Sequence, residues 1–424
     1  MTRACVVAVL AIVSSLVVAA QTPPSPGSST FAIRAGMLID PETGTSSSNQ
    51  TIVVQAGKIT AIGSKVDIPS GATMVDLSRS SVMPGLFDAH THLCMDVDVV
   101  RDAGSYFLTT LHDSDADRAI QGVVNARSML ETGFTTVRDV GNEGRYACVS
   151  VREAIDRGAI VGPTMITAGR IIAPYGGQFH LQPNRPELAE PEYFFADSRD
   201  EMRKAIRENI HYGARVIKIV VDDQPYIYSE DDIRFIIDEA GKAGLKVAAH
   251  AWTRGGAHNA AAAGVASIEH LNGISDEDLE VAKRNGVIAV FTPMPEAFLQ
   301  QFRSGESAAK EEYSTELDRL RSGARVGIPI AFGTDAILEL PGMTRGESAI
   351  QWIDSYTAAG LQPKDILRAM TTTAARLFGV DKERGAIKPQ MAADIIAVPG
   401  NPLNDVSALK RVSFVMKNGR IIKQ

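Results

Sequence analysis

The sequence predicts an α/β fold, namely a (β/α)8 barrel of the TIM type with a small β-sandwich domain formed by the N- and C-terminal segments. Three observations carry this prediction. Apolar, strand-like runs alternate with helix-like segments between residues 84 and 385. From the first to the last expected strand, residues 86–334, this region has the size of eight βα units, about 250 residues. Both ends of the chain instead carry short strands separated by turn residues.

A doubly wound open sheet is the alternative fold. Strands that are apolar throughout fit parallel strands buried on both faces, and both folds contain such strands. No Gly-x-Gly-x-x-Gly or P-loop motif opens a helix of this chain. The nucleotide-binding form of the open sheet is therefore disfavoured, and we expect the barrel.

The first 20 residues are typical of a secretory signal peptide. A basic start at residues 1–3 precedes an apolar run at 4–18, and small residues lead to a cleavage position after Ala20. The run is short for a retained anchor helix, because a membrane span needs about 20 apolar residues. We therefore expect residues 21–30 to form a linker and the protein to be exported, either periplasmic or secreted.

The predicted β-sandwich consists of residues 31–83 and 386–424. Short alternating runs there are interrupted by Gly, Asp and Asn, which indicates antiparallel strands joined by tight turns. The expected strands are 31–35, 51–55, 59–63, 394–398, 412–416 and 421–422. Because the two segments share this pattern, we expect them to pair in one domain.

Residues 84–385 form the predicted barrel. Its eight expected strands are 86–93, 135–140, 164–168, 216–221, 246–250, 267–271, 287–291 and 329–334. Helices are expected between most of them, at 119–132, 199–212, 231–243, 276–285 and 315–326. Such helices return the chain to the start of the next parallel strand.

Composition and charge disfavour several classes of partner. The 424 residues are 45% hydrophobic and 22% charged, which is typical of a soluble globular protein. The formal charge of −7 and the isoelectric point near 5.7 argue against nucleic-acid binding. They also provide no attraction to an anionic membrane surface once the leader is removed. We expect a small-molecule partner.

Two cysteines, Cys94 and Cys148, remain after removal of the leader. An exported compartment permits a disulfide between them. Their spacing alone does not show whether they meet, so the pairing stays open at this point.

Polar side chains gather near the carboxyl ends of the predicted strands, where a barrel places its active site. They are His90, His92, Lys218, His250, His270 and Asp335. Each has a structural explanation when taken singly, since a buried lysine can pair with a carboxylate and an aspartate can cap the next segment. Six such residues at matching strand positions are hard to assign to chance. Imidazole and carboxylate groups are common ligands of divalent metals.

Lys218 lies in a run of branched apolar residues at 215–220. A buried ammonium group is costly unless it is paired. Reaction with carbon dioxide would convert the amine into an anionic carbamate, which can bridge two metal ions. We interpret Asp335 as a further metal ligand, a carboxylate that binds a metal through one oxygen and holds a bridging hydroxide through the other.

These motifs resemble the amidohydrolase superfamily. The matching segments are 84–92 (PGLFDAHTH), 217–218 (IK), 249–250 (AH), 268–270 (IEH) and 333–335 (GTD). Further strings at 133–141 (GFTTVRDVG), 267–270 (SIEH) and 371–375 (TTTAA) are similar to its imidazolonepropionase-related branch. Within that branch the chain is most similar to the Xaa-Pro dipeptidases, the metallocarboxypeptidases and the ochratoxin-degrading amidases.

The resemblance implies a binuclear centre with two divalent metal ions, zinc by preference. The implied ligands are His90 and His92 for the more buried ion, and His250 and His270 for the more exposed ion. Lys218, as N6-carboxylysine, would bridge both ions, and Asp335 would complete the first site. In this family arrangement a shared hydroxide attacks the substrate carbonyl, and Asp335 carries its proton to the leaving nitrogen.

Four further residues, His180, Tyr226, Tyr228 and Arg138, are candidates for substrate binding. His180 follows the third strand and could contact the substrate carbonyl, although the residues just before it depart from the family pattern. Tyr226 and Tyr228 follow the fourth strand and could hold a substrate carboxylate, but a loop tyrosine is more often simple packing. Arg138 could bind the same carboxylate or form an internal ion pair.

The expected function is hydrolysis of an amide or peptide bond in a dipeptide or an N-acyl amino acid, ochratoxin-type amides included. One alternative is a superfamily hydrolase of cyclic amides or lactones, and Lys218 argues against deamination because superfamily deaminases generally use one metal. Another alternative is a non-catalytic zinc-binding protein, against which Asp335 argues because a structural site needs no proton carrier. Oligomers are common in the resembled branch, which leaves a homo-oligomer open.

Overall fold

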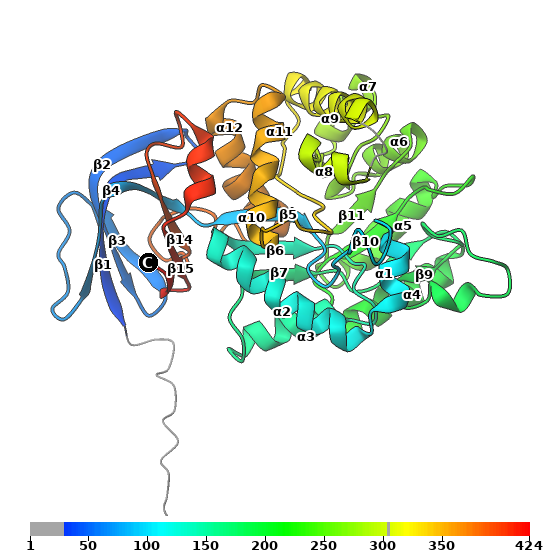
Figure 1. Ribbon diagram of the computed structural model, residues 1–424, viewed down its shortest axis with the longest axis horizontal. Helices are drawn as coiled ribbons and strands as arrows, with labels where there is room; N and C mark the ends of the chain where they lie inside the picture. Colours follow the sequence, from blue (N-terminus) through cyan, green and yellow to red (C-terminus); the bar gives the residue numbers. More distant parts are fainter. Residues whose placement is uncertain (1–28, 303–305) are drawn as a thin grey trace, which may run out of the picture.

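The computed structural model describes residues 29–302 and 306–424, and Figure 1 shows a β-rich domain beside a larger α/β domain. The expected signal peptide, residues 1–20, and most of the expected linker lie outside the described residues. Within the described part of the chain, no helix is both long enough and apolar enough to cross a membrane.

The terminal domain is built on a seven-stranded sheet in the order β16-β15-β14-β4-β1-β2-β3. Its strands are β1 (Thr30–Asp40), β2 (Thr45–Gln55), β3 (Lys58–Gly63), β4 (Thr73–Pro84), β14 (Ile395–Pro399), β15 (Phe414–Lys417) and β16 (Arg420–Lys423). The sheet curls so that edge strand β3 bridges to Ala392, just before β14. It encloses a core drawn from both ends of the chain, which includes Ile33, Val54, Ile395 and Phe414. The predicted sandwich of the two termini is therefore confirmed.

Strand β4 is the one element of this sheet that the sequence does not predict. It pairs in parallel with β1 and antiparallel with β14, so it joins the two ends of the chain. Polar residues interrupt its apolar positions, and the period of two that marks the other strands is lost. Its partners on both sides therefore determine its conformation more than its own pattern does.

Parallel strands form the barrel in two hydrogen-bonded groups, β5-β6-β7 and β8-β10-β11-β12-β13, with β9 paired to the other side of β8. The strands are β5 (Leu86–Thr91), β6 (Phe134–Asp139), β7 (Thr164–Thr167), β8 (Ile171–Ala173), β9 (Tyr193–Phe195), β10 (Ile217–Val220), β11 (Val247–His250), β12 (Ser267–Glu269) and β13 (Ile288–Val290). The predicted barrel is confirmed. The third expected strand differs, because the chain turns at Gly169, with φ +72°, and continues as β8.

The eighth expected strand, 329–334, is irregular. It closes the barrel through isolated parallel bridges, from Ile330 to β13 and from Ala336 to β5. Gly333 lies so close to β5 that an added Cβ would be 3.0 Å from the Cβ of His90. This close approach brings the segment that carries residue 335 against the end of β5.

Helices surround the barrel strands (Figure 1). They are α1 (Tyr106–His112), α2 (Asp115–Thr132), α3 (Ala147–Asp156), α4 (Arg199–His211), α5 (Glu230–Gly241), α6 (Arg254–Ala263), α7 (Asp276–Arg284), α8 (Glu296–Phe302), α9 (Glu306–Val326), α10 (Arg345–Ala349), α11 (Ile353–Ala358), α12 (Pro363–Arg368) and α13 (Ala374–Phe378). Helix α2 begins before its apolar pattern does, because Ser114 and Asp117 form a capping box.

Cys94 and Cys148 form a disulfide, which answers the question that their spacing left open. Cys94 lies just after β5 and Cys148 lies in α3, so the bond ties the loop after β5 to this helix. Both cysteines are buried. Gly122 of α2 permits the close packing, since an added Cβ would lie 2.5 Å from the Sγ of Cys94. The bond therefore supports the loop that follows His92.

Candidate metal centre

Strand β5 carries His90 and His92, whose alternation along a strand directs both rings to one face. Both side chains are nearly completely buried. Asp88 of the same strand accepts hydrogen bonds from the Thr334 hydroxyl at 2.7 Å and from the backbone N of His90 at 3.1 Å. Burial raises the pKa of Asp88 to about 7. These bonds tie β5 to the segment that carries Asp335.

Glu269 of β12 orients the ring of His90. The Nδ1 of His90 donates to Oε2 of Glu269 at 2.8 Å. Since an ionised carboxylate can only accept, the hydrogen lies on Nδ1 and the Nε2 lone pair is left for another partner. Arg138 donates to the other carboxylate oxygen at 2.8 Å. Burial favours the neutral acid, but Arg138 and His90 outweigh it and hold the pKa of Glu269 well below its usual range.

The main chain orients His92. Its Nδ1 donates to the carbonyl of Gly141 at 2.7 Å, which leaves Nε2 at 3.3 Å from the Nε2 of His90. Burial, together with the charge of Lys218, lowers the pKa of His90 to about 4. The His90 ring is therefore neutral near pH 7 and presents a lone pair, as a metal ligand must.

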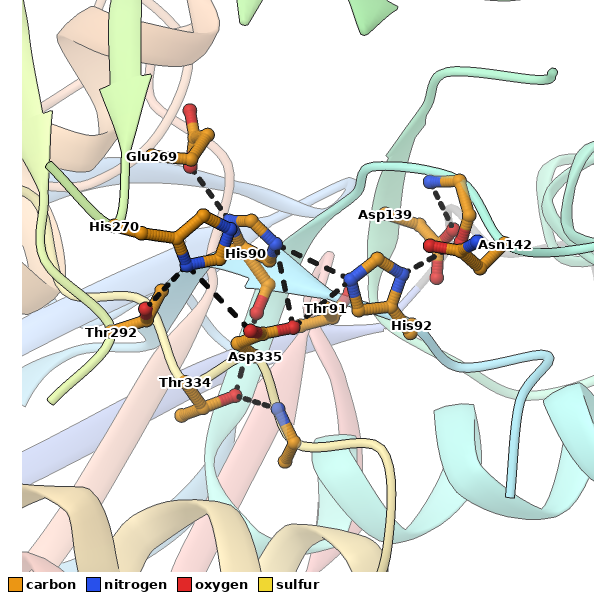
Figure 2. A network of polar contacts seen from close by, with 12 residues as sticks. His90, Thr91, His92, Asp139, Asn142, Glu269, His270, Thr292, Thr334 and Asp335 are labelled. Carbon is orange, nitrogen blue, oxygen red and sulfur yellow. Dashed lines mark hydrogen bonds and ion pairs between the residues drawn. The ribbon is translucent and has the colours of Figure 1, made fainter. Parts of the chain in front are cut away.

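Asp335 meets these two rings from the segment that closes the barrel. Its backbone adopts φ +57°, and its N donates to the carbonyl of His90 at 2.8 Å. Oδ1 lies 3.1 Å from Nε2 of His92 and 3.5 Å from Nε2 of His90. Figure 2 shows the three side chains converging. Donor atoms around a tetrahedral zinc ion lie about 3.4 Å apart, so these three atoms fit one ion.

A second set of donors lies beside the first. His250 ends β11 and His270 follows β12, and their ring centroids are 4.6 Å apart. The Nδ1 of His270 lies 2.9 Å from the hydroxyl of Thr292 (Figure 2). The Nε2 of His250 is buried and has no hydrogen-bond partner among the described residues. Oδ2 of Asp223 lies 3.0 Å away, within ion-pair distance, and a metal ion bound to the ring nitrogen would satisfy it.

Lys218 of β10 extends into the same region. The residue is 2% exposed, and burial lowers the pKa of its amine to about 8. No hydrogen bond or ion pair joins its Nζ to another residue in the described part of the chain. Because this pKa lies closer to neutrality than that of an exposed lysine, a minor fraction of the amine is unprotonated near pH 7 and can act as a nucleophile.

These donors line a cavity of ≈ 340 Å³ at the carboxyl ends of the barrel strands. The remaining walls are Met95, Tyr106, Asn142, Ile171, Gln178, Asp223, Trp252 and Ile337. The location is the one where barrel enzymes hold their active sites, and the volume suits a small molecule. The six residues that the sequence predicts as metal ligands therefore meet in one cavity.

The four residues that the sequence offers for substrate binding do not line this cavity. Arg138 is buried and donates to the carbonyl of Ala89, to Ser267 and to Glu269. His180 is exposed. Tyr226 is half-exposed and Tyr228 is buried, and each hydroxyl donates to a main-chain carbonyl at 2.7 Å. These contacts favour the structural explanations that the sequence leaves open for Arg138 and the two tyrosines.

Several cavity residues come from loops and are not predicted as functional residues by the sequence. Asn142 and Asp223 lie a few residues beyond β6 and β10, so a search of all positions that follow strands could have found them. Tyr106 opens helix α1 and carries no comparable signal. Glu269 precedes His270 directly, but nothing in the sequence shows that it contacts His90.

A closed parallel barrel with histidine, lysine and aspartate side chains at the carboxyl ends of its strands is typical of one class, the barrel enzymes whose active-site donors can hold metal ions. The sequence profile of the Amidohydrolase family matches residues 81–422. The chain belongs to the amidohydrolase family.

Individual relatives agree with this assignment. Ochratoxinase of Aspergillus niger is 31% identical over 431 residues, which cover 92% of this chain and 86% of ochratoxinase. Its crystal structure matches with a TM-score of 0.79 and 26% identity, over 94% of this chain and 96% of the other. A crystal structure of a Xaa-Pro dipeptidase with bound methionine gives a TM-score of 0.82 at 27% identity, over 93% of this chain and 100% of that chain.

A third relative is imidazolonepropionase of Paracoccus denitrificans. It is 26% identical over 384 residues, which cover 81% of this chain and 86% of that protein. The resemblance inferred from the sequence motifs is therefore confirmed. The protein is a hydrolase that acts on C–N bonds.

Proposed function

We propose that the protein is an exported, binuclear metal-dependent amidohydrolase that releases a C-terminal amino acid from an amide or peptide. The observation that carries the proposal is the pair of adjacent donor sets in one small cavity. The proposed substrates are dipeptides and N-acyl amino acids, with ochratoxin-type amides among them. The similarity to ochratoxinase and to a Xaa-Pro dipeptidase supports this choice.

The residues fit two divalent ions, and we propose zinc because imidazole and carboxylate donors suit it. The proposed ligands are His90, His92 and Asp335 for the first ion, His250 and His270 for the second, and carboxylated Lys218 for both. When bound, the two ions supply a water molecule of lowered pKa and polarise the scissile carbonyl.

We propose that Lys218 is carboxylated at Nζ. The unprotonated amine adds to the carbon of carbon dioxide: one N–C bond forms, one C=O π bond breaks with its electron pair moving to oxygen, and the nitrogen releases one proton to water. The lowered pKa and the lack of a partner for Nζ support this modification. Asp223, Glu269 and Asp335 act on Nζ electrostatically, so a carbamate anion there needs nearby cations to balance its charge.

Asp335 is the proposed proton carrier. Burial favours its neutral acid, but His90, His92 and Lys218 together hold the pKa of the carboxyl below its usual range. Its side chain is 27% exposed and faces the cavity. The carboxylate takes a proton from the attacking water and delivers it to the leaving nitrogen, which an amide needs because an amine anion is a poor leaving group.

The other walls of the cavity suit a small amphipathic substrate. Tyr106, Asn142 and Gln178 offer polar groups, and Met95 and Ile337 offer apolar surface. We propose that the polar groups hold the ends of the substrate on either side of the scissile bond.

Export from the cytoplasm remains part of this proposal. The disulfide between Cys94 and Cys148 supports it, because such bonds persist in oxidising compartments. Measurement of the N-terminus of protein recovered outside the cytoplasm tests it, and a start at Gln21 is the expected result.

The test of function is a hydrolysis panel with zinc-loaded mature protein that starts at Gln21. The panel contains Xaa-Pro and other dipeptides, N-acyl amino acids that include ochratoxin A, lactones and imidazolone-like rings. Release of a free amino acid, strongly reduced with Asp335→Asn, is the expected result. Turnover of rings or lactones alone would reassign the substrate, and a metal-loaded protein with no turnover at all would indicate a binding protein.

A further inference from the structure

Asp223, which is not one of the six predicted metal ligands, lies next to the Nε2 of His250. His250 is 6% exposed, and its Nε2 makes no hydrogen bond among the described residues. Oδ2 of Asp223 nevertheless lies 3.0 Å from this nitrogen. The two atoms are within ion-pair distance, but their geometry does not make a hydrogen bond, so both atoms are also placed to share a cation.

Asp223 and its neighbour Asp222 have different tasks. Asp222 is completely buried and accepts hydrogen bonds from the backbone N of Trp252 and of Thr253, at the start of α6. Asp223 turns to the cavity instead, with its side chain 19% exposed. Asp222 therefore stabilises the start of α6, whereas Asp223 forms part of the cavity wall.

Asp223 is held in a strained backbone conformation. Its backbone has φ +81°, a conformation that a residue with a Cβ rarely adopts. Gln178 donates to Oδ2 at 2.8 Å, and Tyr193 in turn donates to the Gln178 side chain at 2.7 Å. Strained residues that their surroundings hold in place are frequent at ligand sites.

The distance between Oδ2 and Nε2 suits two ligands of one cation. Two donors that each lie about 2.1 Å from a zinc ion, and 3.0 Å from one another, subtend an angle of roughly 90° at the metal. That angle is common in five- and six-coordinate sites. We propose that Asp223 is a seventh protein ligand, which binds the more exposed divalent ion together with His250.

This inference rests on the proposed binuclear centre and extends it. A carboxylate from the loop after β10 gives the more exposed ion an anionic ligand that does not depend on the state of Lys218. It also occupies a coordination position that a substrate carbonyl would otherwise take. When the substrate binds, Asp223 would either move aside or remain while the coordination number increases by one.

The experiment titrates metal-free mature protein with Zn²⁺ and with Co²⁺. Calorimetry and metal analysis count the ions per chain, and the Co²⁺ absorption spectrum reports the ligands of each ion. The variants are Asp223→Asn and Asp223→Gly. Glycine relieves the strain at φ +81°, so the Asp223→Gly protein should fold at least as stably as the wild type when metal is absent. Asp197→Asn makes the same charge change at an exposed residue outside the cavity.

We expect the wild type and Asp197→Asn to bind two ions per chain. Both Asp223 variants should keep the tighter ion and bind the second more weakly. Loss of a residue that only supports a ligand typically weakens metal binding by about 10- to 100-fold, so loss of a direct ligand should weaken it by at least this much. The Co²⁺ spectrum of the second ion should also change. Unchanged affinity and spectrum in both Asp223 variants would overturn the role of Asp223 alone. A wild type that binds fewer than two ions would overturn the binuclear centre, and the role of Asp223 with it.

Discussion

The Nδ1 of His90 and the Oε2 of Glu269 lie 2.8 Å apart, although 179 positions separate the two residues in the chain. The pair links β5 to β12. Arg138 of β6 completes the group by donating to Glu269 and to the carbonyl of Ala89 in β5. One buried cation and one buried anion thus balance each other, and the ring of His90 is oriented before any metal binds.

Arg138→Met should lower the free energy of unfolding by about 3–5 kcal/mol, because it leaves Glu269 as an unpaired buried charge. Urea denaturation of the metal-free protein measures the change. Arg127→Met is the control, since the exposed ion pair of Arg127 with Glu131 contributes at most about 1 kcal/mol. Unchanged stability together with a raised KM would instead favour the sequence-based hypothesis that Arg138 binds a substrate carboxylate.

Lys218→Ala should lose most of the bound metal and most of the activity, because the bridging oxygens of the proposed carbamate disappear. Added acetate or propionate should restore part of both, since a free carboxylate can take the same place. Zinc content and hydrolysis rate are measured with and without the added acid. The exposed Lys204→Ala serves as the control. Full activity of Lys218→Ala without any added acid would rule out the carbamate.

Asp335→Asn should retain bound metal yet lower kcat by about 10²- to 10⁴-fold, the usual contribution of a positioned acid–base group. The amide keeps an oxygen donor but cannot carry the proton. Zinc analysis and steady-state kinetics on the best substrate of the panel separate the two effects. Wild-type kcat in this variant would remove Asp335 from the proton-transfer role.

Replacement of both Cys94 and Cys148 by alanine should destabilise the protein by about 4 kcal/mol, the entropy expected for a closed loop of this length. The two residues are 54 positions apart in the sequence. Urea unfolding under non-reducing conditions compares the variant with the wild type. The difference in free energy of unfolding between the two proteins should vanish when both are unfolded in strong reductant. A difference that persists in reductant would indicate that the variant loses side-chain packing instead.

Glu316 of α9 should make stability depend on pH. Burial raises the pKa of its carboxyl from 4.5 to about 7, although Arg319 lies 3.5 Å away. Between these values the folded protein binds more protons than the unfolded chain, so the stability contributed by Glu316 is present at low pH and is lost as pH rises. The free energy of unfolding of Glu316→Gln, relative to that of the wild type, should therefore increase by up to about 3 kcal/mol as the pH is raised from roughly 5 to 8. Urea unfolding at both values tests this, and parallel pH profiles would contradict it.

Much of the candidate site could be predicted because its donors lie on strands or directly after them. His90 and His92 share one face of β5 by the strand period, and the closed barrel places the ends of β11 and β12 across from the end of β5, with the ring centroids of His90 and His270 4.9 Å apart. The order of the elements therefore predicts which side chains meet, even though they are far apart in the sequence.

The remaining cavity residues could not be predicted for a physical reason. The directions of Tyr106 and Asp223 depend on loop paths, and the φ of Asp223 is one that no residue pattern indicates. Arg138 was ambiguous because a charged residue on a barrel strand can point to the cavity or to a buried partner. Its contacts with Glu269 show the second case. Strand β4 was missed because its neighbours, rather than its own apolar pattern, hold it in the sheet.

The position of β4 between β1 and β14 has a consequence for the synthesis of the protein. Its partner β1 precedes it, but β14 follows after the whole barrel has been made. At about 5–20 residues per second, roughly 15–60 s separate the emergence of the two strands from the ribosome. During this interval one edge of β4 has open backbone groups that can pair with another nascent chain. A chain held unfolded until it has crossed a membrane would avoid this hazard, whereas a chain that folds as it is translated would depend on chaperones to shield the edge.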